Sequence, residues 1–445
     1  MNRASFKYKT VSQKWVKVIP SHWRMERLKL IFGLRKEQNN PIITDNILSL
    51  TAKQGVVPYA EKEGVGGNKP KSDLTKYNIC REGDLLVNNM NVVSGAAGVS
   101  RYTGCISPVY YPLVLRHNDN VWYYHYIFRL VSFQRSLIGL GKGILMHEND
   151  NGTLTSVRMR ISMDYLGNVL LPVPPRDEQD QIVRFLDWKI SEINKLICIW
   201  RSEIKELKEL KKIIIKKTIT GKNSKSKTKQ SGIDWISDIP ETWEIQHVKN
   251  VAVITNGSDP KTAGNIPVYG SGDGAFKTCG EYKEGPTVLI GRKGATLHIP
   301  HYVEGKYWNV DTAFDVHMKD NNDLRWFYYL AQCFNYQLYI SKTTLPSMTQ
   351  TDYNNMQIPV PPVFIQHEIV SYLDAENLKI NKIVDLINEK INTFIELKSV
   401  IISDVVTGKI DVRHVTIPEY EHVDDVVDDD TDNDDEAAEA GEEEG

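Results

Sequence analysis

The stretch Leu171-Pro-Val-Pro-Pro175 recurs as Ile358-Pro-Val-Pro-Pro362, at an offset of 187 positions. The two copies remain similar without a gap over about fifty residues. The residues that match at this offset include Gln179 and Gln366, Leu186-Asp187 and Leu373-Asp374, Ile193-Asn-Lys195 and Ile380-Asn-Lys382, Glu209-Leu-Lys211 and Glu396-Leu-Lys398, and Thr220-Gly-Lys222 and Thr407-Gly-Lys409. Agreement of this length indicates that the chain contains an internal repeat of long period.

Each copy continues with apolar residues three or four positions apart, which is typical of an amphipathic helix close to a heptad pattern. This stripe runs from Ile182 to Ile214 in the first copy and from Ile369 to Ile401 in the second. The helices are expected to end at Gly221 and Gly408, where a left-handed cap costs glycine little. A helix of ~45 residues is roughly 65 Å long and cannot bury its stripe alone. The two helices are therefore predicted to pack on each other; the alternative is two separate amphipathic helices.

A second repeat lies upstream, where Ile19-Pro20-x-x-Trp23 reappears as Ile239-Pro240-x-x-Trp243. Between this motif and the proline-rich motif the two halves differ in length and content. Short apolar runs at Asp84–Val87 and Thr287–Ile290, flanked by turn residues, are typical of strands in a mixed α/β domain. The expected divisions are residues 1–171, a first helix within 172–221, a basic linker at 222–232, a second domain at 233–357, a second helix within 358–409, and a C-terminal segment at 410–445.

The charge of the chain is divided unevenly between its body and its end. The formal net charge is -3, but residues 418–445 contain fifteen Asp and Glu and no Lys or Arg, so residues 1–417 carry about +12. A basic body predicts a polyanionic partner. The acidic tail cannot bury enough apolar surface to fold and is expected to be disordered. A solubilising tail is favoured over a DNA mimic that covers the basic surface.

The sequence offers little support for metal, disulfide or membrane features. The five cysteines are scattered and form no C-x-x-C pair, so neither a disulfide framework nor a structural zinc site is predicted. No histidines are paired at H-x-x-x-H spacing. No run of 18 apolar residues occurs, and the N-terminus lacks the apolar core of a signal peptide. The expected location is therefore cytoplasmic.

The order of these features resembles the specificity subunits of Type I restriction-modification enzymes, over about residues 1–417. The most specific parts are Leu171–Asp187 and Ile358–Asp374, which carry a P-P-x-x-x-Q pattern. Further similar segments are Tyr269–Gly272, Gly285–Gly294, and Gly83–Asn88 followed by Ser107-Pro108. One departure from the family is Val363-Phe-Ile365, which replaces the common acidic residue before Gln366.

The resemblance implies an α+β fold, with two mixed α/β target recognition domains separated by an antiparallel two-helix coiled coil. It also implies pseudo-twofold symmetry and a division of labour among subunits. Each recognition domain would recognise one half of a bipartite, asymmetric double-stranded DNA target. Two methyltransferase subunits using S-adenosylmethionine, and restriction subunits that translocate DNA with ATP and Mg, would be separate partners. No cofactor is expected in this chain.

Catalytic motifs are weak or absent in the sequence. Gly270-x-Gly272-x-Gly274 is not followed by a helical pattern, so a turn is favoured over a nucleotide loop. No P-loop and no Asp/Asn-Pro-Pro-aromatic motif occurs, and Glu203-x-Lys205 is interpreted as helix-surface charge pairing. A non-catalytic subunit is therefore predicted. The alternatives are an orphan specificity subunit that serves only a DNA adenine methyltransferase, or a self-contained methyltransferase or endonuclease.

Candidate DNA-contacting residues are polar or basic and lie in expected turns and loops. Arg, Asn and Gln suit bidentate contacts with base edges, whereas Lys and Ser more often contact phosphate. Tyr59, Tyr282 and Trp308 are candidates for base stacking, although core packing is favoured. Trp188, Ile199 and Ile215 lie off the main helical stripe and are expected to form a docking face for methyltransferase subunits. The DNA candidates are Lys53, Gln54, Lys69, Lys71, Asn88, Asn89, Asn91, Arg101, Lys142, Lys277, Arg292, Lys293, Thr296, Lys342, Thr343, Ser347, Thr349 and Gln350.

Overall fold

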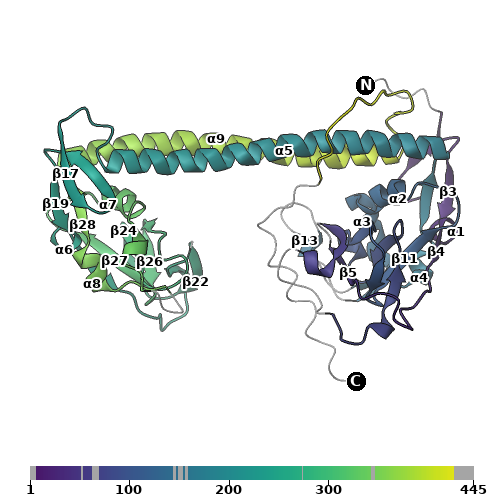
Figure 1. The fold of residues 1–445 in the computed structure, drawn as a ribbon, viewed down its shortest axis with the longest axis horizontal. Coiled ribbons are helices and arrows are strands. Elements are labelled where there is room, and N and C mark those ends of the chain that lie inside the picture. The colour runs from purple at the N-terminus through teal and green to yellow at the C-terminus, as the bar shows by residue number, and fades with distance from the viewer. Residues whose placement is uncertain are drawn as a thin grey trace. The chain divides into compact units, whose positions relative to one another are not determined.

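The computed structural model describes residues 7–51, 54–62, 70–143, 147–148, 154–155, 159–272, 274–341 and 346–424. The chain divides into two compact units (Figure 1). Unit 1 comprises Met1–Arg201 and Glu389–Gly445, and unit 2 comprises Ser202–Asn388. Both boundaries fall inside long helices, so each unit contains part of both helices. From residue 425 onward, the acidic tail lies outside the described residues. The expectation of disorder is wrong for its first residues, because Asn194 Nδ2 of the first long helix donates to the Val423 and Asp424 carbonyls (3.0 Å each).

The two repeated segments form helices of equal length, α5 (Arg176–Ile219) and α9 (Val363–Val406), each of 44 residues. Each begins directly after a Pro-Pro pair, whose missing N–H groups suit a helix start. Each ends at a glycine with positive φ, 70° at Gly221 and 72° at Gly408. The amide of Lys222 donates to the Lys217 carbonyl (2.9 Å), and Lys409 donates equivalently to Asp404 (2.8 Å). These bonds form the glycine-terminated cap that the sequence predicts.

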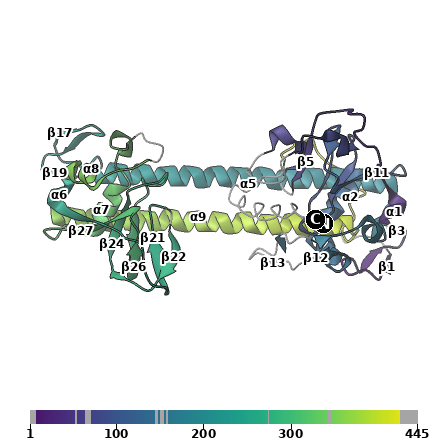
Figure 2. The same ribbon diagram turned by 90° about the horizontal axis from the view of Figure 1, so that it is seen from below.

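The two helices pack on each other in antiparallel fashion within each unit (Figure 2). In unit 1, the ring centroids of Trp200 and Phe394 lie 4.9 Å apart. Lys398 Nζ donates to Asn194 Oδ1 there (3.2 Å), and in unit 2 Lys211 Nζ donates to Asn381 Oδ1 at the same distance. These two pairs are related by the 187-residue offset. The repeat therefore extends from sequence to individual hydrogen bonds.

Unit 1 is built around a four-stranded antiparallel sheet in the order β4-β11-β8-β9. Its strands are β4 (Phe32–Leu34), β11 (Tyr110–Leu115), β8 (Leu85–Asn88) and β9 (Ala97–Val99). The paired strands around it are β1 (Tyr8–Thr10) with β2 (Val18–Pro20), β3 (Arg24–Arg27) with β16 (Leu170–Val173), β5 (Leu48–Thr51) with β6 (Gly55–Pro58), β7 (Asn78–Cys80) with β10 (Gly104–Ile106), β12 (Lys142–Gly143) with β15 (Met159–Arg160), and β13 (His147–Glu148) with β14 (Leu154–Thr155). The short helices are α1 (Leu28–Ile31), α2 (Val121–Phe128), α3 (Val131–Leu137) and α4 (Met163–Leu166).

Unit 2 repeats this plan with the sheet order β20-β27-β24-β25 and adds a second four-stranded sheet, β22-β21-β26-β23. The first sheet contains β20 (Ala252–Asn256), β27 (Ala313–Met318), β24 (Thr287–Gly291) and β25 (His301–Val303). The second contains β22 (Ala275–Cys279), β21 (Ile266–Tyr269), β26 (Lys306–Asn309) and β23 (Lys283–Glu284). The remaining elements are β17 (Thr228–Ile233) with β18 (Ile236–Pro240), β19 (Glu244–His247) with β28 (Gln357–Val360), and helices α6 (Val248–Val251), α7 (Leu324–Ala331) and α8 (Gln350–Asn355).

The expected strands at 84–87 and 287–290 are confirmed as β8 and β24, which lie inside their sheets and are almost fully buried. The expected linker at 222–232 is shorter than predicted. Thr228–Ile233 forms β17, which pairs antiparallel with β18 and has a register shift between Gln230 and Ile233, beside Gly232, where φ is 72°. The sequence of this segment has no strand pattern. Its strand forms by pairing with β18 and is not favoured by the strand propensity of its own residues.

The end of each long helix packs against one Ile-Pro-x-x-Trp motif. In unit 1, a Cβ placed on Gly408 would lie 2.5 Å from the Pro20 ring and 2.9 Å from Trp23. In unit 2, a Cβ on Gly221 would lie 2.4 Å from the Pro240 ring. Glycine is therefore required at both helix ends for close approach as well as for positive φ. These contacts explain why the two short motifs repeat together with the helices.

The glutamine of each P-P-x-x-x-Q pattern is fully buried and joins its helix to the preceding domain. In unit 1, Gln179 Nε2 donates to the Pro174 carbonyl (3.0 Å) and to Asp119 Oδ1 (2.9 Å). Its Oε1 accepts from the Asn120 amide (2.7 Å), at the N-cap of α2. The bonds to Asp119 and Asn120 therefore hold the start of α5 against the start of α2.

Gln366 makes the same set of bonds in unit 2. Its Nε2 donates to the Pro361 carbonyl (2.9 Å) and to Asn322 Oδ1 (2.8 Å), and its Oε1 accepts from the amide of Asp323 (2.8 Å), the N-cap of α7. The P-P-x-x-x-Q pattern is thus a structural junction between a domain and its long helix.

All five cysteines are free thiols, and Cys80, Cys105 and Cys279 are buried. Burial raises the pKa of Cys80 to about 12, so this thiol stays protonated and unreactive near neutral pH. Cys198 is exposed on α5.

Candidate nucleic-acid interface

Two loops that follow the central strands β8 and β24 hold the same backbone position in the two units. The amide of Asn89 donates to the Val109 carbonyl (3.1 Å), and its own carbonyl accepts from Ile161 (2.9 Å). The amide of Arg292 donates to the Thr312 carbonyl (2.7 Å), and its carbonyl accepts from Met348 (2.9 Å). Asn89 and Arg292 are therefore structurally equivalent, although no sequence motif connects them.

In unit 2, several predicted residues converge around the loop after β24. The Ser271 hydroxyl, in the turn between β21 and β22, donates to the Lys293 carbonyl. The Thr296 hydroxyl donates to the Ser271 carbonyl (2.7 Å), and Lys293 forms a β-bridge with Ser347. We call Ser271, Arg292, Lys293, Thr296 and Ser347 the unit 2 loop cluster. The glycines at 270 and 272 belong to a strand-to-strand turn, as the sequence favoured, and no helix follows them.

Two cations of this cluster share one acidic neighbour. Lys293 Nζ lies 3.6 Å from Asp311 Oδ2, and Arg292 Nη1 lies 4.0 Å from the same atom. Arg292 also donates to the Asp311 carbonyl (3.2 Å). The side chains of Arg292 and Lys293 remain 34% and 40% exposed. Both cations can therefore reach an external polyanion, because such partly exposed pairs are weakly held.

The equivalent loop of unit 1 carries asparagines instead of cations. Asn88 Oδ1 accepts from the Met90 amide (2.9 Å), and Asn88 and Asn91 are partly exposed. Asn89 is only 1% exposed, and its Oδ1 has no hydrogen-bond partner. A buried amide oxygen without a partner is unusual in a folded protein. Asn88 and Asn91 are thus the accessible polar groups of this loop.

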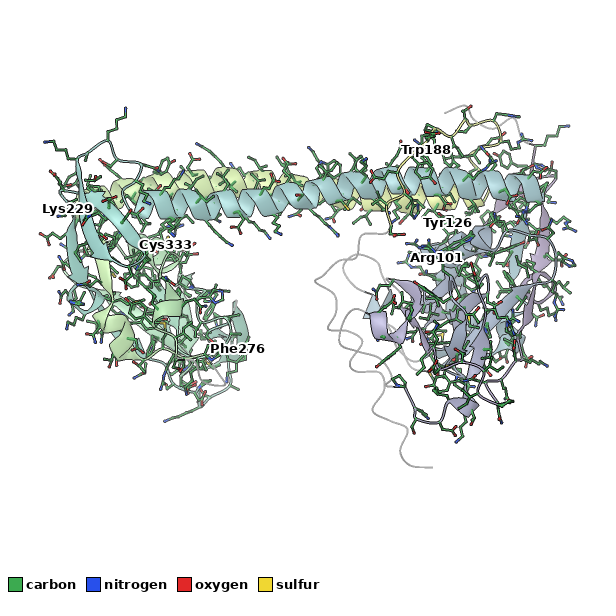
Figure 3. The ribbon with its side chains drawn as sticks, viewed as in Figure 1. Arg101, Tyr126, Trp188, Lys229, Phe276 and Cys333 are labelled. Atoms are coloured by element: carbon green, nitrogen blue, oxygen red, sulfur yellow. The ribbon has the colours of Figure 1, made fainter. Side chains whose placement is uncertain are left out.

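The other DNA candidates have varied surroundings. Arg101 is exposed, with its guanidinium 5.7 Å from the Trp122 ring on α2, and Figure 3 labels it in unit 1. Lys277 is exposed on β22. The Gln54 amide donates to the Thr51 hydroxyl in the β5–β6 turn (2.9 Å), and the Lys71 amide donates to the Tyr77 hydroxyl (3.1 Å). Lys53, Lys69, Lys342 and Thr343, together with the side chain of Lys142, lie outside the described residues.

Thr349 and Gln350 have structural contacts that the sequence analysis did not anticipate. Thr349 and Asp352 form a capping box at the start of α8. Gln350 Nε2 donates to the Ile254 carbonyl (2.5 Å). The pattern Thr-x-x-Asp is a known signature of a helix start and would have identified this role.

Of the three stacking candidates, Tyr282 differs most from the expected core packing. It is 52% exposed, and Lys306 Nζ lies 4.0 Å from its ring centroid. Trp308 is partly exposed and donates from Nε1 to the Ser258 carbonyl (2.7 Å), whereas Tyr59 is partly exposed in a short 3-10 turn.

Sequence analysis also missed a tyrosine–aspartate pair in each unit. The Tyr126 hydroxyl on α2 donates to Asp187 on α5 (2.5 Å), and Tyr329 on α7 donates to Asp374 on α9 (2.5 Å). Burial raises the pKa of Asp187, although the Tyr126 hydrogen bond opposes that shift. Both aspartates stand in the repeated Leu-Asp dipeptide, so the repeat itself was the available signal.

A second candidate surface lies on the long helices. Four of the exposed apolar side chains on the helices of each unit have an exposed apolar counterpart in the other unit at the 187-residue offset, with exposed fractions between 38% and 58%. We call them apolar set 1 (Leu196, Ile199, Leu397 and Val400, in unit 1) and apolar set 2 (Ile383, Leu386, Leu210 and Ile213, in unit 2).

The docking face expected from Trp188, Ile199 and Ile215 needs correction. Ile215 is 2% exposed and belongs to the hydrophobic core of unit 2, because the domain that follows α5 packs on it. Trp188 packs partly on the core of unit 1, with Lys189 Nζ 3.5 Å from its ring centroid. Ile199, at 53% exposure, remains available and belongs to apolar set 1.

Within the described parts of the chain, no group of three or more His, Cys, Asp or Glu side chains is placed to hold a metal ion. No helix among those residues is both long enough and apolar enough to span a membrane.

Comparison with known proteins gives a consistent set of relatives. Residues 240–394 match the family described as Type I restriction modification DNA specificity domain. The chain is 27% identical over 135 residues to a protein named as a type I restriction enzyme specificity subunit of Haemophilus influenzae, a match covering 30% of this chain and 35% of that protein. It is 25% identical over 260 residues to one named as the MjaX specificity subunit of Methanocaldococcus jannaschii, covering 56% and 57%. These matches span about a third and just over half of the relatives' lengths.

The fold is similar to that of a chain from a solved structure concerned with complex assembly and conformational transition of the type I R-M system. The TM-score is 0.65 at 16% sequence identity, and the match covers 88% of this chain and 99% of the other. At this identity, the likeness supports a shared fold.

Proposed function

We propose that this chain is a specificity subunit of the type I restriction-modification class, which recognises DNA for a larger enzyme and has no catalytic centre of its own. The loops after β8 and β24 each recognise one half of a bipartite target, and the paired helices α5 and α9 separate the two recognition domains. The observation that carries this proposal is the backbone equivalence of the loops at Asn89 and Arg292, because these equivalent loops expose different polar side chains in the two units.

The difference between these loops favours an asymmetric target. Arginine suits a bidentate contact with guanine, whereas asparagine suits adenine. Unit 1 offers Asn88 and Asn91, and unit 2 offers Arg292 and Lys293. The two half-sites are therefore proposed to differ in base sequence.

Domain exchange tests this assignment. Replacing residues 233–357 with the corresponding domain of another family member is expected to change one half-site only, because the loops of unit 1 remain intact. The number of unread bases between the half-sites should stay the same, because α5 and α9 are untouched. Sequencing of methylated sites in the host measures both results. A change in both half-sites would contradict independent recognition by the two domains.

The apolar sets support a complex with two methyltransferase subunits. Two equivalent surfaces on one chain suit two copies of the same partner, and exposed apolar side chains that recur at matched positions mark an interaction surface. We propose that these partners supply S-adenosylmethionine chemistry, while restriction subunits supply ATP-driven translocation and cleavage with Mg.

The basic body of the chain predicts a strong dependence of DNA affinity on salt. Residues 1–417 carry about +12, and lysines and arginines bound to phosphate release condensed counterions. Affinity is expected to fall about 10³-fold or more between 50 and 200 mM salt if about six phosphates are contacted. Deleting residues 418–445 should leave affinity unchanged or increase it, as measured by fluorescence anisotropy. Weaker binding after this deletion would instead place the acidic tail in the interface.

A further inference from the structure

The second sheet of unit 2 concentrates aromatic rings beside lysines. Lys277 Nζ lies 5.3 Å from the Phe276 ring centroid, and Lys306 Nζ lies 4.0 Å from that of Tyr282. Lys283 Nζ lies 5.8 Å from the Trp308 ring. Significant cation–π pairs occur about once per 70–80 residues, so three on one small sheet form a concentration. We call the sheet β22-β21-β26-β23 the aromatic–lysine sheet.

Phe276 is the most accessible of these rings. It is 60% exposed, compared with 52% for Tyr282, and it lies on β22, the edge strand of the sheet. The first four residues of β22, from Ala275 to Thr278, are all exposed. In Figure 3, Phe276 lies at the margin of unit 2. The ring is therefore accessible to an external partner.

The ring of Phe276 is continuous with the unit 2 loop cluster. A Cβ placed on Gly270 would lie 3.5 Å from the Phe276 ring. The next residue, Ser271, is fastened to Lys293 and Thr296 by two hydrogen bonds. The β21–β22 hairpin and the loop after β24 are therefore joined through Ser271, next to the glycine that faces the Phe276 ring.

The chemistry of this surface suits duplex DNA. A two-stranded β-ribbon fits the major groove, and the cation of Lys277 suits a phosphate. The Phe276 ring has no hydrogen-bonding group, so it can contact a base only by stacking or by apolar contact. Inserted apolar side chains act most easily at flexible pyrimidine–purine steps, which unstack at low cost.

We propose that Phe276 is a specificity-determining wedge that stacks against a base at a pyrimidine–purine step of the half-site recognised by unit 2. Lys277 then contacts the adjacent phosphate. This inference rests on the proposed function, because it takes the unit 2 loop cluster to be a DNA-binding surface. It adds recognition by stacking to the hydrogen-bonded recognition proposed for Arg292.

The test is selection of binding sites from random duplexes by the purified full chain, followed by affinity measurements on the selected duplex. F276A is expected to bind about tenfold more weakly and to lose preference at one step, because removal of a base-stacking ring costs affinity of this order. F276Y, which keeps the ring, should retain affinity. K277A should bind more weakly, and its affinity should depend less steeply on salt, with a slope lower by about one.

F364A is a matched control, because Phe364 is 64% exposed in the same unit but stands at the start of α9.

The outcomes separate the inference from the function on which it rests. If the wild-type chain selects no sequence, the proposed function fails. If it selects a sequence and F276A keeps both affinity and preference, the wedge is overturned. Equal weakening by F276A and F364A would also overturn it, since only one of these rings adjoins the loop cluster. Because Phe276 is exposed, F276A should keep the wild-type unfolding temperature.

Discussion

Replacing both Leu196 and Ile199 with glutamate is expected to reduce the number of bound methyltransferase subunits from two to one. These side chains, 38% and 53% exposed, are the α5 part of apolar set 1. Docking would place the new carboxylates in an apolar interface without partners. An unpaired buried charge costs about 3–5 kcal/mol, so affinity at this surface should fall by about 100-fold or more. Native mass spectrometry of the co-purified complex gives the stoichiometry directly.

The repeat supplies a matched variant for this experiment. I383E/L386E changes the equivalent positions of apolar set 2, which are 43% and 58% exposed. It should also leave one subunit bound, and the combined four-residue variant should bind none. All three proteins should unfold at the wild-type temperature, because the replaced side chains are exposed. Retention of two subunits by both double variants would show that the apolar sets do not bind this partner.

The long helices were predictable because local signals agree with each other. Proline pairs define their starts, glycines define their ends, and the apolar stripe has helical period over the whole length. The repeat strengthened each of these signals by presenting it twice. This reasoning from the helical stripe gave a wrong prediction for Ile215. Its position off the stripe indicated an exposed face, but a side chain off one stripe is buried when a different domain packs there.

The candidate interface was predictable only in part, because it depends on contacts between distant segments. The sequence identified Asn89 and Arg292 separately, but their equivalence is set by hydrogen bonds to Val109 and Thr312, which follow no shared motif. Phe276 was missed because a phenylalanine is ordinarily assigned to a core. Its exposure follows from the edge position of β22, which depends on strand order rather than on local sequence.

Replacing Gln366 with alanine is expected to lower the free energy of unfolding of unit 2 by about 2–4 kcal/mol. The side chain is fully buried, and three hydrogen bonds end on it. Its loss leaves the Asp323 amide and the Pro361 carbonyl without these partners, and each unsatisfied buried group costs about 1–3 kcal/mol. Chemical denaturation, followed by hydrogen exchange of amides in each unit, measures the size and location of the effect.

Gln366→Glu separates the lost hydrogen bonds from the lost volume. Glutamate has nearly the same shape, but when ionised it cannot donate, so it faces the Pro361 carbonyl and Asn322 Oδ1 without the two bonds that glutamine makes. Q366E should therefore destabilise unit 2 at neutral pH at least as much as Q366A, and it should recover stability at acidic pH as the carboxyl group becomes protonated. Q179A and Q179E provide the same comparison in unit 1, where Pro174, Asp119 and Asn120 are the equivalent partners. A loss below about 1 kcal/mol for both alanine variants would mean that water replaces the missing amide, and the junction would then contribute little to joining each domain to its helix.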